Sequence, residues 1–252
     1  MSVIDTATNI VTGTIAVGAT PFGIAFTPDG AAVYVANFGD ATVSVITTAT
    51  NTVTDIIIVS AGPRGVAITA DGATAYVTNF GGTVSVIDIA TNTVTGTIVV
   101  GATPRGVAFA ANGLTAYVAN GGDDTVSVID TATNSVIDII SVGATPFGVA
   151  VASDGLTAYV TNGDDTVSVI DTSTNTVTAV IGAGAGPRGV AAGTGGAVYV
   201  TNSGNSTVSV LTTVSTLGSA AGDGGNGGSG GLIGNGGAGG AGGTGADGIN
   251  GG

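Results

Sequence analysis

Short stretches rich in Val, Ile and Thr alternate along this chain with clusters of Gly, Asp and Asn. Examples are Ala-Tyr-Val-Thr-Asn at 75–79 and Thr-Val-Ser-Val-Ile-Asp at 125–130. β-Branched and aromatic residues favour strands, whereas Gly, Asn and Asp favour the turns between strands. The strong helix formers Glu, Lys and Gln are absent from all 252 residues. The pattern therefore predicts an all-β protein.

These stretches recur at a nearly fixed interval. The string Thr-Val-Ser-Val occurs five times, beginning at 42, 83, 125, 166 and 207. A proline precedes each unit, at Pro21, Pro63, Pro104, Pro146 and Pro187. Turn residues divide the full units into four short strands, with an Asp-Gly or Asn-Gly pair after the first strand in four of the five units. A period of about 40–45 residues with four strands per unit is typical of a β-propeller blade.

The number of strands in each part of the chain indicates which incomplete blade needs a strand from elsewhere. Residues 1–17 supply only the last two strands of a unit, residues 21–182 supply four full units, and residues 187–212 supply three strands. We expect the N-terminal strand around Val11–Val17 to complete the last unit and close a five-blade ring, which leaves residues 2–5 as a surplus strand. Two alternatives stay open. One is an open arc that closes by pairing with a second chain, and the other is a fragment of a longer propeller.

Composition and charge exclude several functions. The chain has no His or Cys, and its net charge is −13 with only Arg64, Arg105 and Arg188 as cations. Nucleic acid is therefore not an expected partner, since phosphate binding needs clustered basic residues. No apolar run is long enough to insert into a membrane, and the N-terminus carries no visible signal peptide. We expect a monomer without a cofactor.

The repeat resembles the YVTN family of β-propellers. Tyr-Val-Thr-Asn stands at 76–79, 159–162 and 199–202, and Tyr-Val-Ala-Asn stands at 34–37 and 117–120. Proteins with this repeat include surface-layer and YncE-like proteins, so the resemblance implies a propeller at the cell surface, in the envelope or secreted. Lactonase-like enzymes and dehydrogenase subunits share the fold, and fold alone therefore does not determine function.

The composition changes near the C-terminus, which divides the chain into a propeller at 1–213 and a glycine-rich tail at 214–252. From Gly218 onward, 19 of 35 residues are Gly. Such a segment buries too little apolar surface to offset the entropy of ordering, so we expect disorder. The tail resembles the PGRS region of mycobacterial PE-PGRS proteins, which implies a surface location. Asp247 lies in one copy of a calcium β-roll nonapeptide and is a weak calcium candidate.

One position of the repeat is a candidate binding site. The residue directly after the proline is Phe22, Arg64, Arg105, Phe147 or Arg188 in the successive units. Because this position begins the innermost strand of a blade, we expect these side chains to ring one mouth of the propeller. Three guanidiniums beside two aromatic rings suit a protein partner or a small anionic ligand. The alternative is that each arginine pairs with an aspartate of a neighbouring loop or with backbone carbonyls.

The aspartates offer two further interpretations. Adjacent pairs in two loops could contribute to a calcium site, although other loops lack the pair: Asp123, Asp124, Asp164 and Asp165. The alternative for these is hydrogen bonding to their own loops. Asp5, Asp88, Asp130 and Asp171 recur at one position before a Thr-x-Thr-Asn-type turn. We expect them to accept hydrogen bonds from turn N–H groups, which is a structural function.

The sequence therefore predicts a non-enzymatic surface or secreted binding module. The alternative class is a small-molecule or metal-dependent propeller enzyme, lactonase-like or glycosidase-like. Such an enzyme needs carboxylates that converge on one mouth from different blades, whereas here the Asp positions repeat in register. A truncated gene product without independent function is a further alternative.

Overall fold

The computed structural model describes residues 1–193 and 195–212, and every regular element in these residues is a β-strand. Two strands form an N-terminal hairpin, β1 (Ser2–Asp5) and β2 (Ile10–Thr14). The following strands form five blades, each an antiparallel sheet in which consecutive strands are neighbours. Blades 1 to 4 have four strands, and blade 5 has three strands among the described residues.

Strands at the same position of each blade have the same sequence pattern. The first strands are β3 (Pro21–Phe26), β7 (Pro63–Ile68), β11 (Pro104–Phe109), β15 (Pro146–Val151) and β19 (Pro187–Ala192). The second strands are β4 (Ala32–Asn37), β8 (Thr74–Asn79), β12 (Thr115–Asn120), β16 (Thr157–Asn162) and β20 (Ala197–Asn202). The third strands are β5 (Thr42–Thr47), β9 (Thr83–Asp88), β13 (Thr125–Asp130), β17 (Thr166–Asp171) and β21 (Thr207–Thr212). The fourth strands are β6 (Thr52–Ile58), β10 (Thr93–Val99), β14 (Ser135–Ser141) and β18 (Thr176–Gly182).

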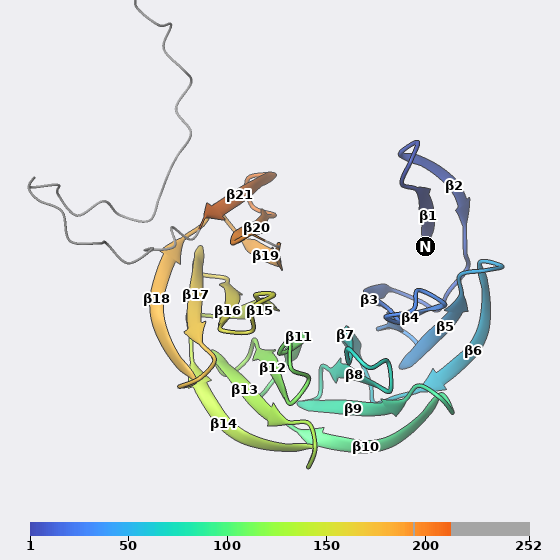
Figure 1. Ribbon diagram of the computed structural model, residues 1–252, viewed down its shortest axis with the longest axis horizontal. Coiled ribbons are helices and arrows are strands. Elements are labelled where there is room, and N and C mark those ends of the chain that lie inside the picture. Colours follow the sequence, from blue (N-terminus) through green and yellow to red (C-terminus); the bar gives the residue numbers. More distant parts are fainter. Residues whose placement is uncertain (194, 213–252) are drawn as a thin grey trace, which may run out of the picture.

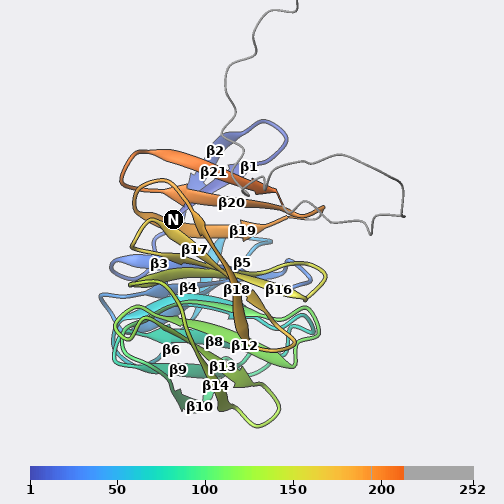
Figure 2. The same cartoon turned by 90° about the vertical axis from the view of Figure 1, so that its left-hand side faces the viewer.

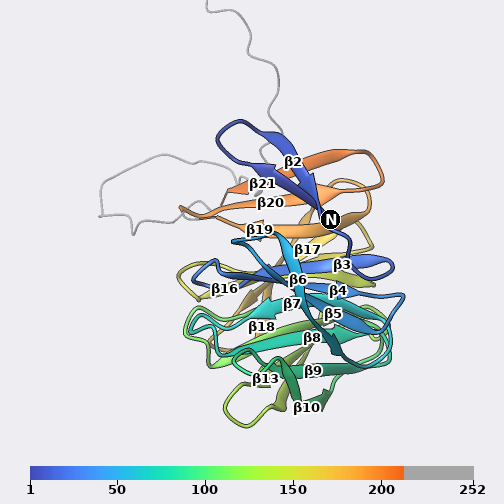
Figure 3. The ribbon, with the colours of Figure 1, turned by 90° about the vertical axis from the view of Figure 1, so that its right-hand side faces the viewer.

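The blades follow one another along an arc, with their first strands on the inner side and their fourth strands on the outer side (Figure 1). The side views show β18 (Figure 2) and β6 (Figure 3) as outer strands that cross the edges of the blades. The predicted all-β propeller of four-stranded blades is therefore confirmed.

Each blade buries one apolar face against the next blade. Tyr34, Val43 and Val45 of blade 1 pack in one cluster with Val77 and Ile87 of blade 2, and all five side chains are buried. Equivalent clusters join blades 2 and 3, blades 3 and 4, and blades 4 and 5. The strands are therefore apolar on both faces, because each inner blade lies between two others.

The tyrosine of the second strand also makes a polar contact with the next blade. The Tyr117 hydroxyl donates to Oδ1 of Asn175 at 3.2 Å. Asn175 lies in the turn between β17 and β18, where its φ of 53° is left-handed. Asn is one of the few residues that adopt this conformation readily. The same bond joins Tyr34 to Asn92 and Tyr76 to Asn134, so the recurring tyrosine has a structural function.

The first strands of neighbouring blades approach so closely that glycine is needed there. A Cβ on Gly65 would lie 2.3 Å from the carbonyl oxygen of Arg105 in the next blade. The Thr78 hydroxyl accepts the Gly65 N–H at 2.8 Å and donates to the same Arg105 oxygen at 2.6 Å. Thr161 makes the equivalent bridge from Gly148 to Arg188. The threonine of the Tyr-Val-Thr-Asn motif thus connects adjacent blades.

The aspartates that end β1, β9, β13 and β17 have the predicted function. Oδ1 of Asp130 accepts the Thr133 N–H at 2.8 Å, and Asp5, Asp88 and Asp171 accept equivalent turn N–H groups. These bonds favour the charged carboxylate. The backbone and side chain of Thr133 accordingly lower the pKa of Asp130 below its ordinary value.

The predicted closure by the N-terminal strand is corrected by the strand pairing. Within the described residues β2 pairs only with β1, and β21 pairs only with β20. The hairpin has its own turn, in which Asp5 accepts a backbone N–H group. Ile15, directly after β2, packs with Val33, Val35 and Ile46 of blade 1. These local contacts form without a long-range pairing. Residues 2–5 are therefore a paired strand, and the hairpin and blade 5 lie at the two ends of an open arc (Figure 1).

The ends of the arc leave apolar side chains exposed. Tyr199 of blade 5 is 50% exposed, whereas its counterparts in blades 1 to 4 are buried. At the other end, Ile24 and Phe26 of blade 1 are also exposed, because the hairpin covers only the outer part of that face. The predicted disordered tail lies outside the described residues. Within them, no helix has the length and apolarity to cross a membrane.

Candidate functional site

The five residues that follow the prolines lie at the beginning of the first strands, on the inner side of the arc (Figure 1). The structure brings them together in two groups. Arg64 stacks with Phe22, and Arg105 and Arg188 both stack with Phe147. The loops between the second and third strands emerge at the same end of the blades and add further side chains.

Arg64 lies among three aromatic rings. Its Cζ atom is 5.1 Å from the centre of the Phe22 ring, 5.6 Å from that of Phe38 and 5.7 Å from that of Phe80. Phe38 packs edge to face against both other rings, with centroid distances of 5.6 and 6.0 Å. A cation over aromatic faces is favourable, and it replaces part of the hydration that burial removes. The rings therefore hold the guanidinium in place.

Arg105 and Arg188 lie near one phenylalanine ring. The Cζ atom of Arg105 is 3.7 Å from the centre of the Phe147 ring, and that of Arg188 is 4.5 Å from it. Gly121 leaves room for Arg105, because a Cβ there would lie 2.6 Å from the Arg105 Nε atom. Arg188 Nε donates to the Ser203 hydroxyl at 2.9 Å. Stacking thus fixes two further guanidiniums beside the first.

The cluster has unbalanced positive charge. Burial lowers the pKa of Arg64 below its ordinary value, and the charge of Arg188 lowers it further. Burial also lowers the pKa of Arg105, with added repulsion from Arg64 and Arg188. Nε of Arg64 and both Nε and Nη1 of Arg105 are buried without an acceptor among the described residues. An anionic ligand would relieve the repulsion and could supply acceptors to the accessible N–H groups.

The loop aspartates form no hydrogen-bonded ion pair with these arginines among the described residues, since their carboxylates bond to backbone N–H groups instead. Oδ2 of Asp123 accepts the Ala102 N–H at 2.5 Å, and Oδ2 of Asp164 accepts the Ala144 N–H at 3.0 Å. Asp124 and Asp165 accept from Thr145 and Gly186. The alternative in which each arginine pairs with a loop aspartate is therefore not what the described residues show.

The same contacts bear on the calcium hypothesis. In the part of the chain that the structure describes, no group of three or more carboxylate, imidazole or thiol side chains could hold a metal ion. The carboxylates instead accept hydrogen bonds from the loops that precede the first strands, as described above for Asp123, Asp124, Asp164 and Asp165. Asp247 lies outside the described residues.

Sequence reasoning placed Phe22, Phe147 and the three arginines but missed Phe38 and Phe80. Both follow directly after the asparagine of the second strand, where the other blades have Gly121, Gly163 or Ser203. The sequence feature that could have identified them is a phenylalanine in two blades at a loop position where the other blades have a small residue. Their exposure, 44% for Phe80, makes them part of the accessible surface beside Arg64.

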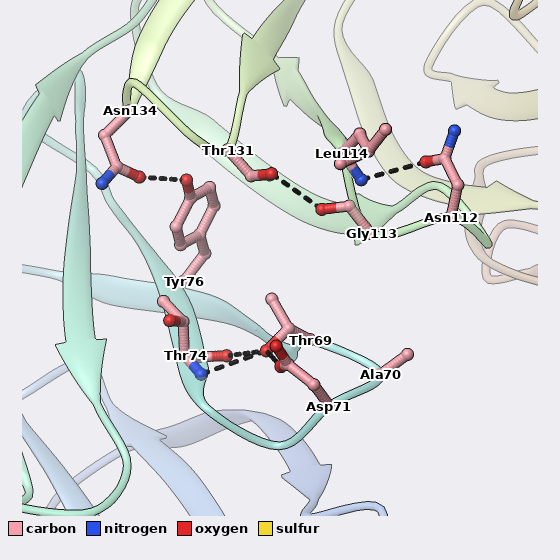
Figure 4. Close-up of a pocket in the computed structure, with 10 residues that line it drawn as sticks. All are labelled: Thr69, Ala70, Asp71, Thr74, Tyr76, Asn112, Gly113, Leu114, Thr131 and Asn134. Carbon is pink, nitrogen blue, oxygen red and sulfur yellow. Dashed lines mark hydrogen bonds between the residues drawn. The ribbon is translucent and has the colours of Figure 1, made fainter.

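A cavity of about 400 Å³ lies between blades 2 and 3, at the opposite end of the strands (Figure 4). The Tyr76 hydroxyl bonds to Asn134 on one side, and Thr69, Asp71 and Thr74 bond to one another on the other. Burial and the charge of Asp130 raise the pKa of Tyr76 to about 12. The polar groups here largely satisfy one another, so the arginine cluster is the stronger candidate site.

Comparison with known proteins supports the fold. The chain is a β-propeller repeat protein, and residues 185–211 match the model of the NHL repeat. No curated protein matches the sequence. A hydrazine synthase chain from Kuenenia stuttgartiensis is 26% identical, with a TM-score of 0.66 over 81% of this chain and 70% of that chain. A functionally unknown protein from Desulfotomaculum acetoxidans is 17% identical, with a TM-score of 0.72 over 81% and 72%, and shows the shared fold.

Proposed function

We propose that this protein is a non-catalytic binding module that captures an anionic group at the cluster of Arg64, Arg105 and Arg188. One observation supports this most strongly. The three guanidiniums lie together in a chain of net charge −13, and among the described residues none of them is hydrogen bonded to a carboxylate. The anionic group belongs either to a small ligand or to a protein partner.

The rigid support of the cluster favours binding. Stacking on Phe22, Phe38, Phe80 and Phe147 fixes the guanidiniums before any ligand arrives. A preorganised site loses little side-chain entropy when it binds. Burial is the main cause that lowers the pKa of Arg105, and repulsion from Arg64 and Arg188 adds to it; anion binding relieves that repulsion.

A catalytic function has less support, although one propeller of similar structure carries the name of an enzyme. The chain contains no His, Cys, Lys or Glu, which are the commonest proton-transfer and nucleophilic residues besides Asp and Ser. The carboxylates of the loop residues Asp123 and Asp164 are bonded to backbone N–H groups. We therefore prefer binding to catalysis.

The test is a titration with small anions, followed by NMR. The chain has three arginines, so its ¹H–¹⁵N spectrum contains three arginine Nε–H signals, which single Arg→Gln variants assign. Acetate, benzoate and inorganic phosphate serve as probes. We expect saturable shifts of these signals, and of the backbone amide signals around the cluster, in the wild type. The triple variant R64Q/R105Q/R188Q has no arginine signals, and we expect its backbone amide signals at the same positions not to shift. If no probe causes a saturable shift in the wild type, or if the backbone signals of the triple variant shift as in the wild type, the proposal is wrong.

We further propose that the module works at the cell surface or after secretion. This rests on the resemblance of the repeat to surface-layer propellers and of the tail to PGRS regions. Fractionation of the native host with an antibody to the propeller tests it. Recovery of the protein only from the cytosolic fraction would contradict this location without affecting the binding site.

A further inference from the structure

The three arginines of the cluster are not equivalent. Arg188 has a hydrogen-bond acceptor, the Ser203 hydroxyl, and its side chain is exposed. Arg64 and Arg105 are only partly exposed, and they have buried N–H groups without acceptors among the described residues. A ligand cannot reach these buried atoms, but Nη1 and Nη2 of Arg64 and Nη2 of Arg105 are outside the buried set and have no acceptor among the described residues. These accessible donors come from two arginines that begin the first strands of adjacent blades.

The surroundings of this pair are also asymmetric. Phe22 and Phe80 are 56% and 44% exposed, and Phe38 connects their rings. This run of aromatic rings lies beside Arg64, whereas Phe147 has guanidiniums near it from both Arg105 and Arg188. The more exposed aromatic surface therefore lies on the Arg64 side of the pair.

Two kinds of interaction are thus available to one ligand. A carboxylate has two oxygens, and two neighbouring guanidiniums can each donate a charge-assisted hydrogen bond to it from their accessible Nη groups. Exposed phenylalanine rings favour an aromatic group, which can pack edge to face or offset against them. A ligand that carries both groups, a carboxylate attached to an aromatic ring, fits the site better than a carboxylate or a ring alone.

We propose that the site binds an aromatic carboxylate, with the carboxylate at Arg64 and Arg105 and the ring against Phe22 and Phe80. This inference rests on the proposed anion-binding function and names its ligand class. Arg188 then contributes its charge at longer range without a direct hydrogen bond to the ligand.

The experiment compares benzoate, acetate, benzyl alcohol and inorganic phosphate by the same NMR titration. Benzoate has both groups, acetate and benzyl alcohol have one each, and phosphate is an anion of different shape. We expect benzoate to bind about tenfold or more tightly than the other three, since the paired hydrogen bonds and the ring contact each contribute. The Nε–H signals of Arg64 and Arg105 should shift more than that of Arg188.

Variants within the chain provide matched controls. R64Q and R105Q should each weaken benzoate binding about tenfold or more, because a charge-assisted hydrogen bond is lost, whereas R188Q should weaken it only about two- to threefold. Phe80→Ala should remove the advantage of benzoate over acetate. Phe26→Ala is the control for that change, since Phe26 is 62% exposed at the far end of β3. Circular dichroism verifies folding, and R64K and R105K, which keep the charge but lose the fork, replace any Gln variant that does not fold.

The outcomes separate this inference from the function on which it rests. If acetate or phosphate binds as tightly as benzoate, or if R188Q loses as much affinity as R105Q, the aromatic carboxylate assignment is wrong while anion binding stands. If no anion binds to the wild type, both are wrong. Equal binding of benzyl alcohol and benzoate would show an apolar site and would overturn both as well.

Discussion

Gly65 is the position at which a single methyl group should test the packing between blades. An alanine Cβ there would lie 2.3 Å from the carbonyl oxygen of Arg105, whereas ordinary van der Waals contacts begin near 3.4 Å. The first strands β7 and β11 would have to separate by about 1 Å, because the clashing atom belongs to the backbone and cannot rotate away. The same movement stretches the 2.6 Å hydrogen bond from Thr78 to that oxygen.

The expected loss of stability follows from these contacts. Overpacking typically costs about 1–3 kcal/mol, and the weakened hydrogen bond adds about 1 kcal/mol. Alanine restricts the unfolded chain, which returns about 0.4–1 kcal/mol. We therefore expect Gly65→Ala to lower the free energy of unfolding by about 1–4 kcal/mol.

Gly189→Ala is the matched control, and urea denaturation followed by circular dichroism is the assay. Gly189 has the same place in blade 5, where no further blade follows among the described residues. Its nearest contact would be the Thr201 hydroxyl at 3.1 Å. We expect this variant to change stability by less than about 1 kcal/mol. Equal denaturation midpoints for the two variants would show that the close approach of neighbouring first strands does not constrain Gly65.

Three further predictions test the contacts between blades. Thr78→Val should cost about 1 kcal/mol more than Thr201→Val in urea denaturation, because only the first loses a bridge to the next blade. Tyr117→Phe should cost about 1 kcal/mol while Tyr199→Phe changes stability by a few tenths, and equal losses would show that the hydroxyl bond contributes nothing. Because burial raises the pKa of Tyr76 from 10.0 to about 12, its contribution to stability is complete below pH 10 and is lost as pH rises towards 12. The urea midpoint should therefore fall over this range, and less in Tyr76→Phe.

The blade could be predicted from the sequence because every local signal agreed. Alternating Val and Thr, Asp-Gly turns and one proline per unit recur in register, so each strand is identified several times over. Closure of the ring could not be predicted in this way. Val11 lies on a strand whose pattern suits either its own hairpin or the edge of blade 5. The pattern of a strand does not specify which of two equivalent edges it joins.

The candidate site could be predicted in part for a related reason. A residue that begins a first strand must lie on the inner side of the arc, so Arg64, Arg105 and Arg188 were correctly brought together. Loop side chains have no such periodicity. Phe38 and Phe80 lie in loops, and their direction depends on packing that no repeat position specifies. The loop aspartates were expected at a calcium site or bonded to their own loops, and the structure instead bonds them to backbone N–H groups of neighbouring loops.

The position of the cluster within the arc explains why its arginines differ. In a repeat protein each unit is stabilised by its neighbours, so a unit with a neighbour on both sides is more rigid than one at an end. Arg64 and Arg105 belong to blades 2 and 3, which are packed on both faces. Arg188 belongs to blade 5, whose outer face exposes Tyr199 and Val210. A preorganised anion site needs rigid supports, and the architecture provides them at the two arginines whose N–H groups lack acceptors.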